Sequence, residues 1–555
     1  MALEPAFRDV GEGFTPSRAG ASPAPTLRLD YVSPLPPVRS GIADYSLDLL
    51  PHLAKLANVR LIHLPGQPVA PEIVQAWPMA PASETGKDVR LPLYQMGNNR
   101  HHEGVMELAL KIPGVLTLHD VVLHHLLLDV TLGRGEFYPY KERLTRDHGW
   151  IGEAAALAKR WNAYGDAPVF ALPAHRDLLR RQRGVLVHSE WAAALVREED
   201  PEIRVRAISM GVPLPPAVDP EAGRLLRRRL GLPGDRPVLG SFGFQTPIKR
   251  TGVAIRALAH PGLEHTHLLI VGEASKGLEL EEEARRAGVA DRVHVLGFLP
   301  FEDFEAAIAA VDLCLNLRYP TAGETSASLL RVLAAGRPAI VSDYAQFADL
   351  PSEVVIRVPL GGDEEPGELA ALLRNLLANP ERLRAMGEAA REHVRVRHDP
   401  AKSAAMVVEA CREWRELPPP GGKLPEVPPP TSLAWGKLDG EVEVEGADLP
   451  WPEGERRRLR IRLRNRGFAR WVAGDKGPGG VAVVVKLFTD EGLTENLLAE
   501  RPWLPLPRDL QPGEEAEIET EVRRPPGYAH LWIEPHLFGG LGLSKIGGPR
   551  WERRL

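Results

Sequence analysis

Short apolar runs alternate with longer helical patterns along most of the chain, and this alternation constrains the fold more than any other feature. Between residues 26 and 215 the apolar runs include VRLIHL at 59–64 and GVLVHSE at 184–190. A second series, in residues 216–395, includes THLLIVGEA at 266–274. Strands that alternate with helices form βαβ units, and unbroken apolar runs are typical of parallel strands covered on both faces. The sequence therefore predicts an α/β fold of two successive doubly wound, Rossmann-like domains facing a cleft.

After Leu417 the composition changes and the helical patterns stop. Residues 418–432 are rich in proline, which predicts an extended linker. Residues 433–555 alternate apolar and polar side chains with a period of two, as in RRLRIRLRN and GVAVVVKLF. Several short strands of this kind, bounded by turn residues, predict an all-β, immunoglobulin-like sandwich. Residues 1–25 lack the long apolar stretch of a signal peptide and are interpreted as a mobile tail.

Composition excludes several classes of protein. The 555 residues carry 68 basic and 74 acidic side chains, and a net charge of −6 gives no global field that would recruit nucleic acid. Two cysteines, Cys314 and Cys411, are too few for a disulfide framework or a cysteine metal site, which suits a reducing cytoplasm. The sequence has no run of about 18 apolar residues, so no membrane-spanning helix is predicted. Peripheral contact with a membrane through a local patch stays open.

An acid and two hydroxyl side chains stand where a helix is expected to begin, in the stretch RYPTAGETSASLLRVL from Arg318 to Leu333. The N-terminus of a helix leaves unpaired N–H groups that bind anions, and the hydroxyls of Thr325 and Ser326 add donors for a phosphate. Glu324 is suited to accept hydrogen bonds from the vicinal hydroxyls of a ribose or sugar. The alternative is helix capping, which favours serine, threonine and acids at any helix start. The first interpretation indicates a ligand with phosphate and polyol parts, that is, a nucleotide sugar.

Two further helix starts carry groups suited to a diphosphate. After the strand pattern RPVLGSFGF, the pair Lys249 and Arg250 precedes a helix, where adjacent cations can bind a pyrophosphate. The alternative is a solvated basic pair. In the stretch PVRSGIADYS, Gly41 opens a helix and would let the backbone approach a phosphate closely. Neither stretch has the glycine spacing of a nicotinamide-binding fingerprint, so dehydrogenase chemistry ranks low.

A third strand, in the stretch LTLHDVVLHH, ends at His119 and Asp120, and His124 and His125 follow on a helix. These four side chains raise the alternative of a metal site. The histidines are not paired at i, i+4 with a third ligand in evident reach, so no metal is predicted. His119 at the strand end fits better as a hydrogen-bond partner for a substrate, and the two later histidines fit as packed or capping residues.

Taken in order, these stretches resemble the glycosyltransferases of family 4, which adopt the GT-B fold. The similarity covers residues 26–417 and is carried by SPLPPVRSGIADYS, LHD, HSEWAAALV, SFGFQTPIKR and YPTAGETSASLLRVLAAGRPAIVSD. The resemblance implies retaining transfer of a sugar from a nucleotide-diphosphate donor to a carbohydrate, lipid-linked or small-molecule acceptor, with no cofactor and no metal. It also implies that residues 26–215 hold the acceptor, that residues 216–395 hold the nucleotide sugar, and that a helix at 396–417 crosses back to the first domain.

The resemblance also implies roles for individual residues. Lys249 and Arg250 would neutralise the diphosphate, and Gly41 would offer its N–H from the opposite domain. His119 would contact a donor-sugar hydroxyl, while Glu324 would bind donor hydroxyls and phosphate together with the two hydroxyl residues after it. The expected catalytic residues are His119, Lys249 and Glu324. The expected donor-binding residues are Gly41, Gly243, Phe244, Lys249, Arg250, Phe298, Leu299, Glu324, Thr325 and Ser326, with Phe298 and Leu299 beside the base.

Two positions depart from the family pattern. Phe244 stands where the family often has an arginine, which leaves one cation fewer for the phosphates, a place that Arg250 is expected to fill. Val332 stands where a second glutamate often holds the ribose, although the letters GETS resemble a bacterial subgroup that shares this feature. A sugar phosphorylase, a nucleotide-sugar epimerase and a non-catalytic sugar-binding scaffold on the same fold stay as alternatives. The sequence leaves open the role of the β-domain and the identity of the donor and acceptor.

Overall fold

The computed structural model describes most of the chain from Leu27 onward. The described residues are 27–38, 40–161, 169–170, 172–215, 220–234, 236–358, 365–421, 424, 431–432, 438–467, 469–474, 480–488, 503–537 and 549–555. The predicted tail at 1–25 lies outside the described residues, and so does most of the predicted linker at 418–432.

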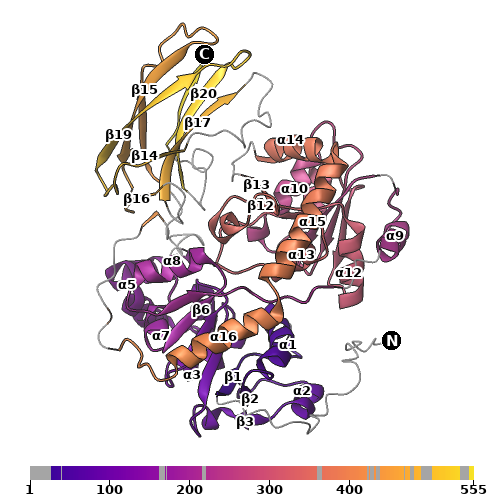
Figure 1. Cartoon of the computed structure of the whole chain (residues 1–555), viewed down its shortest axis with the longest axis vertical. Coiled ribbons are helices and arrows are strands. Elements are labelled where there is room, and N and C mark those ends of the chain that lie inside the picture. Colours follow the sequence, from indigo (N-terminus) through magenta and orange to yellow (C-terminus); the bar gives the residue numbers. More distant parts are fainter. Residues whose placement is uncertain are drawn as a thin grey trace.

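Seven parallel strands form the sheet of the first lobe, the part of the chain from β1 to β7 (Figure 1). Their order is β3-β2-β1-β4-β5-β6-β7. The strands are β1 (Arg28–Val32), β2 (Asn58–His63), β3 (Met79–Pro81), β4 (Leu91–Met96), β5 (Val115–Leu118), β6 (Gly184–Val187) and β7 (Val205–Ala207). The helices are α1 (Gly41–Leu53), α2 (Pro71–Ala76), α3 (Glu103–Ala109), α4 (His124–Val130), α5 (Phe137–Arg160), α7 (Arg176–Arg180) and α8 (Glu190–Glu199), with 3-10 turns η1 (Ala82–Glu84), η2 (Arg100–His102) and η3 (Leu132–Arg134).

Six parallel strands form the sheet of the second lobe, the part of the chain from α9 to α15, in the order β10-β9-β8-β11-β12-β13. The strands are β8 (Val238–Phe242), β9 (His267–Val271), β10 (Val293–Gly297), β11 (Leu313–Asn316), β12 (Ala339–Ser342) and β13 (Val355–Val358). The helices are α9 (Pro220–Arg229), α10 (Thr251–Ala257), α11 (Leu280–Arg286), α12 (Phe301–Ala310), α13 (Ala327–Ala334), α14 (Glu365–Leu377) and α15 (Pro380–Arg397), with 3-10 turns η4 (Pro247–Lys249) and η5 (Ala345–Asp349).

Helices cover both faces of the second sheet, and the side-chain alternation of β9 shows how. Leu268 and Ile270 pack in the cluster that includes residues of α10, α11 and α14. Their neighbours Leu269 and Val271 point the other way, into the cluster that includes residues of α9, α12 and α13. Successive side chains of a strand leave opposite faces, so a strand covered on both sides reads as an unbroken apolar run. The two predicted parallel α/β sheets are therefore confirmed.

The loops that carry the candidate residues leave the carboxyl ends of these strands. His119 follows β5, and Gly41 begins the helix after β1. In the second lobe Gly243 follows β8, and Glu324 lies between β11 and α13. Open α/β sheets bind their ligands at this edge, because helix N-termini and irregular loops gather there.

Helix α16 (Pro400–Trp414) lies against the first lobe although it follows the second in sequence (Figure 1). It packs along α1 and reaches the sheet at β6. A Cβ at Gly184 of β6 would lie 2.1 Å from a ring carbon of Trp414, so glycine is needed at this contact. Beyond the helix, the Leu417 carbonyl accepts a hydrogen bond of 2.9 Å from Arg183. The end of the helical part of the chain is thus fixed to the first lobe.

The C-terminal β region, from β14 to β21, consists of antiparallel and mixed sheets. One sheet has the order β14-β15-β19, and a second has the order β16-β17-β20-β21 with β18 paired to β17. Trp451 and Trp471 are fully buried in the shared apolar core of the region. The strands are β14 (Gly440–Glu445), β15 (Arg456–Asn465), β16 (Val472–Ala473), β17 (Gly480–Phe488), β18 (Trp503–Pro505), β19 (Glu515–Arg523), β20 (His530–Leu537) and β21 (Trp551–Arg554).

The β region contacts both lobes. Its Arg470 guanidinium lies 3.5 Å from the carboxylate of Glu198 on α8 of the first lobe. Its buried His536 lies 3.9 Å from the carboxylate of Asp343, which follows β12 of the second lobe. Tyr344, the next residue, packs against the apolar cores of both the β region and the first lobe. The segment that follows β12 therefore lies where all three parts of the molecule meet.

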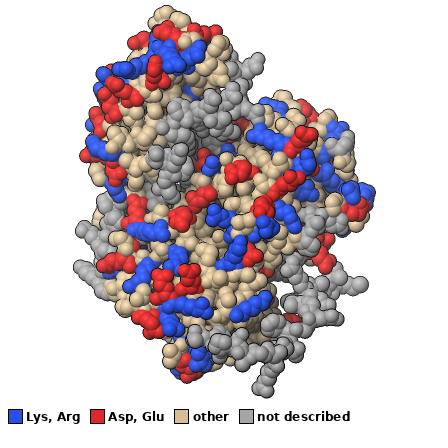
Figure 2. Space-filling view, viewed as in Figure 1, with Lys and Arg blue, Asp and Glu red and all other residues tan. Residues whose placement is uncertain are grey.

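Charged side chains of both signs are mixed over the face seen in Figure 2. On the β region this mixture follows the strands, because Arg460 and Arg462 of β15 lie beside Glu443 of β14 and Glu517 of β19 at 3.2 to 3.7 Å. Such exposed pairs contribute little to stability, because solvent and salt screen them. In the described part of the chain, every helix is too short or too polar to cross a bilayer.

Candidate active site

The loop after β8 brings a buried lysine to the carboxyl edge of the second sheet. Gly243 turns the chain with a φ of +90°, and η4 returns Lys249 to the end of the strand. The side chain of Lys249 is 8% exposed, and its ammonium donates to the carbonyl of Phe242. A Cβ at position 243 would come within 2.8 Å of this nitrogen in a strained backbone conformation, which explains the glycine. Burial, and secondly the charge of Arg318, hold the pKa of Lys249 well below its usual range.

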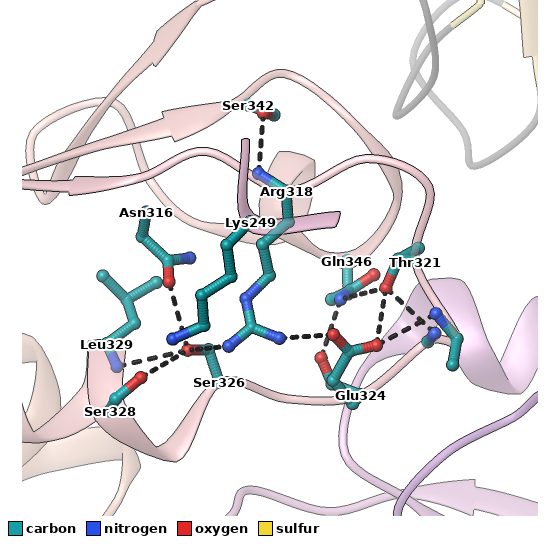
Figure 3. A network of polar contacts seen from close by, with 12 residues as sticks. Lys249, Asn316, Arg318, Thr321, Glu324, Ser326, Ser328, Leu329, Ser342 and Gln346 are labelled. Carbon is teal, nitrogen blue, oxygen red and sulfur yellow. Dashed lines mark hydrogen bonds and ion pairs between the residues drawn. The ribbon is translucent and has the colours of Figure 1, made fainter. Parts of the chain in front are cut away.

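Glu324 lies in a closed set of hydrogen bonds in the loop between β11 and α13 (Figure 3). Its Oε1 pairs with Nη1 of Arg318. Its Oε2 accepts hydrogen bonds from the hydroxyl of Thr321 at 2.9 Å and from the N–H of Ala322 at 3.0 Å. The Gln346 amide donates to the same Thr321 oxygen at 3.0 Å. Three donors thus take most of the roughly four acceptor positions of the carboxylate, which leaves little capacity for ligand hydroxyls.

Ser326 is the N-cap of α13. Its Oγ accepts from the N–H of Leu329 at 3.2 Å and from Nη2 of Arg318 at 3.1 Å, and donates to Oδ1 of Asn316 at 3.3 Å. The capping alternative therefore describes this serine. Ser328, one residue into the helix, lies 3.2 Å from the Ser326 hydroxyl, and its Oγ would be 3.2 Å from a Cβ at position 243. The start of α13 and the Lys249 ammonium thus share one small space.

The remaining predicted residues of the second lobe lie in different surroundings. Arg250 has a left-handed backbone with a φ of 56°, and its guanidinium pairs with the carboxylate of Glu365, which is 3% exposed. Phe244 and Phe298 expose 55% and 61% of their surface, while the partly buried Leu299 packs against an apolar core. Thr325 is half-buried between Glu324 and the cap of α13.

In the first lobe, Gly41 is the first residue of α1, after an N-cap serine. The Ser40 hydroxyl accepts from the N–H of Ile42 at 3.2 Å. A Cβ at Gly41 would meet no atom within 4 Å, so the protein itself has no steric need for glycine there. The open space in front of this helix start leaves room for a ligand to reach the backbone N–H groups.

His119 belongs to a cluster of polar rings behind α1. Its Nε2 lies 2.9 Å from Oε1 of Gln95, and its Nδ1 lies 3.2 Å from Nε2 of His188. The ring of Tyr45 meets the His119 ring edge-on at 4.8 Å, and the buried Tyr45 hydroxyl has no hydrogen-bond partner among the described residues. Burial lowers the pKa of His119 well below its usual range and that of His188 to about 4. Both imidazoles are therefore uncharged at neutral pH.

Asp120 stands between this cluster and the loop of Glu324. Its Oδ2 accepts from the N–H of Asn98 at 2.8 Å. Burial, and secondly the charge of Glu324, raise the pKa of Asp120 to about 7. Asp120 thus belongs to the first lobe, but its pKa depends on a charge of the second lobe.

Direct contacts join the two lobes at this point, which we call the lobe junction. The N–H of Val122 donates to the carbonyl of Ala322 at 2.9 Å. A Cβ at Gly323 would come within 3.0 Å of side chains of Val121 and Trp191, so the second-lobe loop lies directly on the first lobe. Deeper along the helices, Arg331 of α13 pairs with Asp48 of α1 at 3.0 Å. The lobe junction therefore brings together the residues around His119, Lys249 and Glu324.

Sequence reasoning missed three of the side chains described above. Arg318 and His188 each follow an apolar run directly, as His119 does, so their position at a strand end was a usable signal. Tyr45 carries no such signal, because it lies within the helical pattern after Gly41. Among the described residues, no group of three or more histidine, cysteine or acidic side chains could hold a metal ion.

Comparison with known proteins shows which protein family part of the chain is similar to. Residues 236–379 match the family described as glycosyl transferases group 1. Two relatives are a 2-deoxystreptamine glucosyltransferase of Streptomyces kanamyceticus, 28% identical over 229 residues, and a D-inositol 3-phosphate glycosyltransferase of Segniliparus rotundus, 32% identical over 197 residues. The matches cover 39% and 32% of this chain. They cover 57% and 42% of those proteins, so the chain spans about half the length of the curated relatives it matches.

Solved structures share the two-lobed architecture. Sucrose-phosphate synthase from Thermosynechococcus elongatus superposes with a TM-score of 0.52 and 18% identity over 70% of this chain and 98% of its own. HepE of Anabaena, solved in complex with UDP, superposes with a TM-score of 0.50 and 16% identity over 70% of this chain and 100% of its own. At these identities the likeness establishes the fold alone.

Proposed function

Residues 236–379 belong to the glycosyl transferases group 1 family, and from that premise we propose that this protein is a retaining glycosyltransferase. It would move a sugar from a nucleoside-diphosphate donor to an acceptor hydroxyl without a bound metal ion. The observation that carries the proposal is the buried Lys249 ammonium beside the start of α13. Within the described part of the chain no carboxylate pairs with this ammonium. A buried cation without a counterion is costly, which is why the pKa of Lys249 is lowered, and a bound diphosphate would supply the missing charge and favour the charged form.

The proposed reaction breaks the bond between the anomeric carbon and the diphosphate oxygen. Positive charge then grows on the sugar ring and negative charge on the leaving diphosphate. Lys249 and the N–H groups at the start of α13 would stabilise the negative charge by electrostatic preorganisation. The acceptor hydroxyl would attack from the face that the diphosphate leaves and pass its proton to the departing phosphate oxygen. This route retains the anomeric configuration and needs no protein nucleophile.

The first lobe would hold the uncharged parts of the substrates. Neutral imidazoles and a phenol offer hydrogen bonds to sugar hydroxyls without attracting the diphosphate. We assign the donor sugar to His119, as expected from the sequence, and a sugar hydroxyl would replace Gln95 or His188 as a hydrogen-bond partner of its ring. We add Tyr45, whose hydroxyl has no partner among the described residues. Asp120 would accept a hydrogen bond from a hydroxyl at the lobe junction.

The relatives narrow the substrates to test first. The two curated relatives are named for transfer to 2-deoxystreptamine and to D-inositol 3-phosphate, both ring polyols, and HepE has been solved with UDP and with UDP-glucose. We therefore propose a uridine-diphosphate sugar as the donor and a small polyhydroxylated ring as the acceptor.

The domain organisation belongs to the same proposal. We place the acceptor domain at 26–215, the donor domain at 216–395, the returning helix at 396–417 and an immunoglobulin-like sandwich at 433–555. The two β sheets with Trp471 buried between them support the sandwich assignment.

Ligand-induced stabilisation followed by a transfer assay tests the function. The melting temperature of the purified protein is measured with UDP, GDP, ADP and their monophosphates, because a ligand that prefers the folded state raises it. The preferred donor is then incubated with polyol acceptors, and NMR reads the anomeric configuration of the product. A diphosphate-dependent shift with a retained product supports the proposal. Turnover that requires inorganic phosphate, product formed without an acceptor, or binding without any transfer would point instead to a phosphorylase, an epimerase or a scaffold.

A further inference from the structure

We propose that Arg318 is the second cation that binds the donor diphosphate, and that Glu324 serves to position Arg318. This inference rests on the proposed function and makes it more specific. It differs from the expectation from sequence, in which Arg250 supplied the second cation and Glu324 gripped donor hydroxyls.

Arg318 is held rigidly at the end of β11. Its backbone N–H donates to the Ser342 hydroxyl at 3.1 Å. At the far end of the side chain, Nη1 pairs with Glu324 and Nη2 donates to Ser326 at 3.1 Å. The residue is 8% exposed, and its Nε has no hydrogen-bond partner among the described residues. An arginine fixed at three points with an idle buried donor is preorganised for a further acceptor.

Three buried polar atoms of this network lack a hydrogen-bond partner among the described residues, and two of them are donors, on Arg318 and Asn316, while the third is the acceptor Oε1 of Gln346 (Figure 3). Lys249 lies close enough to Arg318 for the two like charges to repel. The Nδ2 of the buried Asn316, from the same strand, also lacks a partner among the described residues. Buried donors are normally satisfied, and two buried cations normally have counterions. Glu324 neutralises one of the two cations, so an anion bound between Lys249 and Arg318 would complete the balance.

Arg250 already has a counterion. It pairs with the buried carboxylate of Glu365, 115 residues away in sequence. Turning Arg250 toward a ligand would leave that carboxylate buried without its cation, which is strongly unfavourable. Arg318 can bind a phosphate through its Nε, which has no hydrogen-bond partner among the described residues, and keep its pair with Glu324.

The experiment measures the affinity of UDP and of UMP for the intact protein by titration calorimetry. GDP with GMP, or ADP with AMP, is used if that diphosphate stabilises the wild type more. We expect Arg318→Gln to weaken diphosphate binding by about tenfold to a hundredfold, as for loss of a charged hydrogen bond. Monophosphate binding should weaken less. The matched control is Arg227→Gln: Arg227 has similar burial and pairs with Asp312 at the amino edge of the same sheet, so its loss should leave the diphosphate-to-monophosphate ratio unchanged.

Glu324→Gln separates the two roles of the glutamate and keeps the test open if Arg318→Gln does not fold. UDP lacks the transferred sugar, so a glutamate that bound only the hydroxyls of that sugar would leave UDP affinity unchanged. A glutamate that positions Arg318 should lower UDP affinity, and we expect a loss of about fivefold or more. Arg250→Gln should lower it less than either variant.

The outcomes distinguish failure of the inference about Arg318 from failure of the proposed function. Unchanged UDP affinity in Arg318→Gln, unchanged UDP affinity in Glu324→Gln, or a larger loss in Arg250→Gln overturns the inference while leaving the glycosyltransferase proposal intact. A wild-type protein that binds no nucleoside diphosphate overturns both.

Discussion

The two sides of the lobe junction hold different kinds of polar side chain. The second lobe contributes charges, with Lys249, Arg318 and Glu324 close together. The first lobe contributes buried rings, among them His119 and Tyr45, and burial keeps the imidazole uncharged at neutral pH. Both sides are polar and enclosed, but the fixed charges are concentrated on the second lobe.

This difference matches the chemistry of the proposed donor, a nucleotide sugar. The diphosphate carries the charge of the ligand and departs with more, so it needs fixed cations. The sugar and the acceptor carry hydroxyls, which uncharged donors and acceptors can hold without trapping phosphate. Asp120 is the exception on the first lobe, because its pKa of about 7 leaves this carboxyl group partly charged at neutral pH.

Of the substitutions considered, removal of the Lys249 charge should lower the rate of sugar transfer most. We expect Lys249→Ala to lower the transfer rate by about a hundredfold, because a contact to the charge that develops in the transition state is lost. Steady-state kinetics measures the effect. Lys87→Ala, which removes an exposed lysine paired with Glu84 in the first lobe, should leave the rate unchanged. Equal rates for Lys249→Ala and the wild type would contradict the charged role of the second lobe.

The uncharged state of the first lobe should appear in the pH dependence of stability. His102 is fully buried, and burial lowers its pKa from 6.5 to about 3. The unfolded chain therefore takes up this proton first as the pH falls, so the free energy of unfolding decreases below about pH 6.5. Between pH 6.5 and pH 5 the loss is about 2 kcal/mol.

Chemical denaturation across this range measures the loss, and His102→Gln should reduce it by the contribution of His102 alone, because buried His119 and His188 also have lowered pKa values and retain part of the slope. Its half-exposed neighbour provides the control, since His101→Gln should keep the curve of the wild type. A slope as steep in His102→Gln as in the wild type would show that His102 does not contribute to it.

Asp120 should set the pH dependence of catalysis near neutrality. Its carboxylate faces the N–H of Asn98 from its own lobe, and Glu324 and Arg318 from the other. As the pH falls below about 7 the carboxylate gains a proton and stops accepting a hydroxyl, so kcat/KM should be about tenfold below its plateau at pH 6. Asp120→Asn should remove the inflection near pH 7 from the pH profile of kcat/KM. His188→Gln should lower kcat/KM but retain this inflection, since the pKa of His188 is about 4. An inflection retained in Asp120→Asn would assign it elsewhere.

The smallest expected effect concerns the Tyr45 hydroxyl. Because this buried group has no partner among the described residues, Tyr45→Phe should leave the melting temperature unchanged or slightly raised. If the hydroxyl binds a substrate, KM should rise about fivefold, as for loss of one neutral hydrogen bond. Unchanged KM values for donor and acceptor would remove Tyr45 from the site.

Periodicity in the sequence predicted the two parallel sheets because burial on both faces leaves a direct record in the strands. Strand ends also pointed to Lys249, His119 and the loop of Glu324. The partners of these groups left no such record. Arg250 looked available beside Lys249, but its counterion Glu365 lies on a helix 115 residues later, and only the folded chain brings the two together. Ser326 could equally cap a helix or bind phosphate until its hydrogen bonds were known.

The β region contacts both lobes outside the lobe junction. Its Arg470 lies beside Glu198 on α8, and its His536 lies beside Asp343 after β12. Two bodies joined only by a flexible connection can swing apart freely, whereas a third body attached to both acts as a strut. To admit or release a substrate, one lobe has to detach from this strut or the strut has to travel with it. We therefore expect the amplitude of opening to be limited by a region whose described residues lie outside the proposed site.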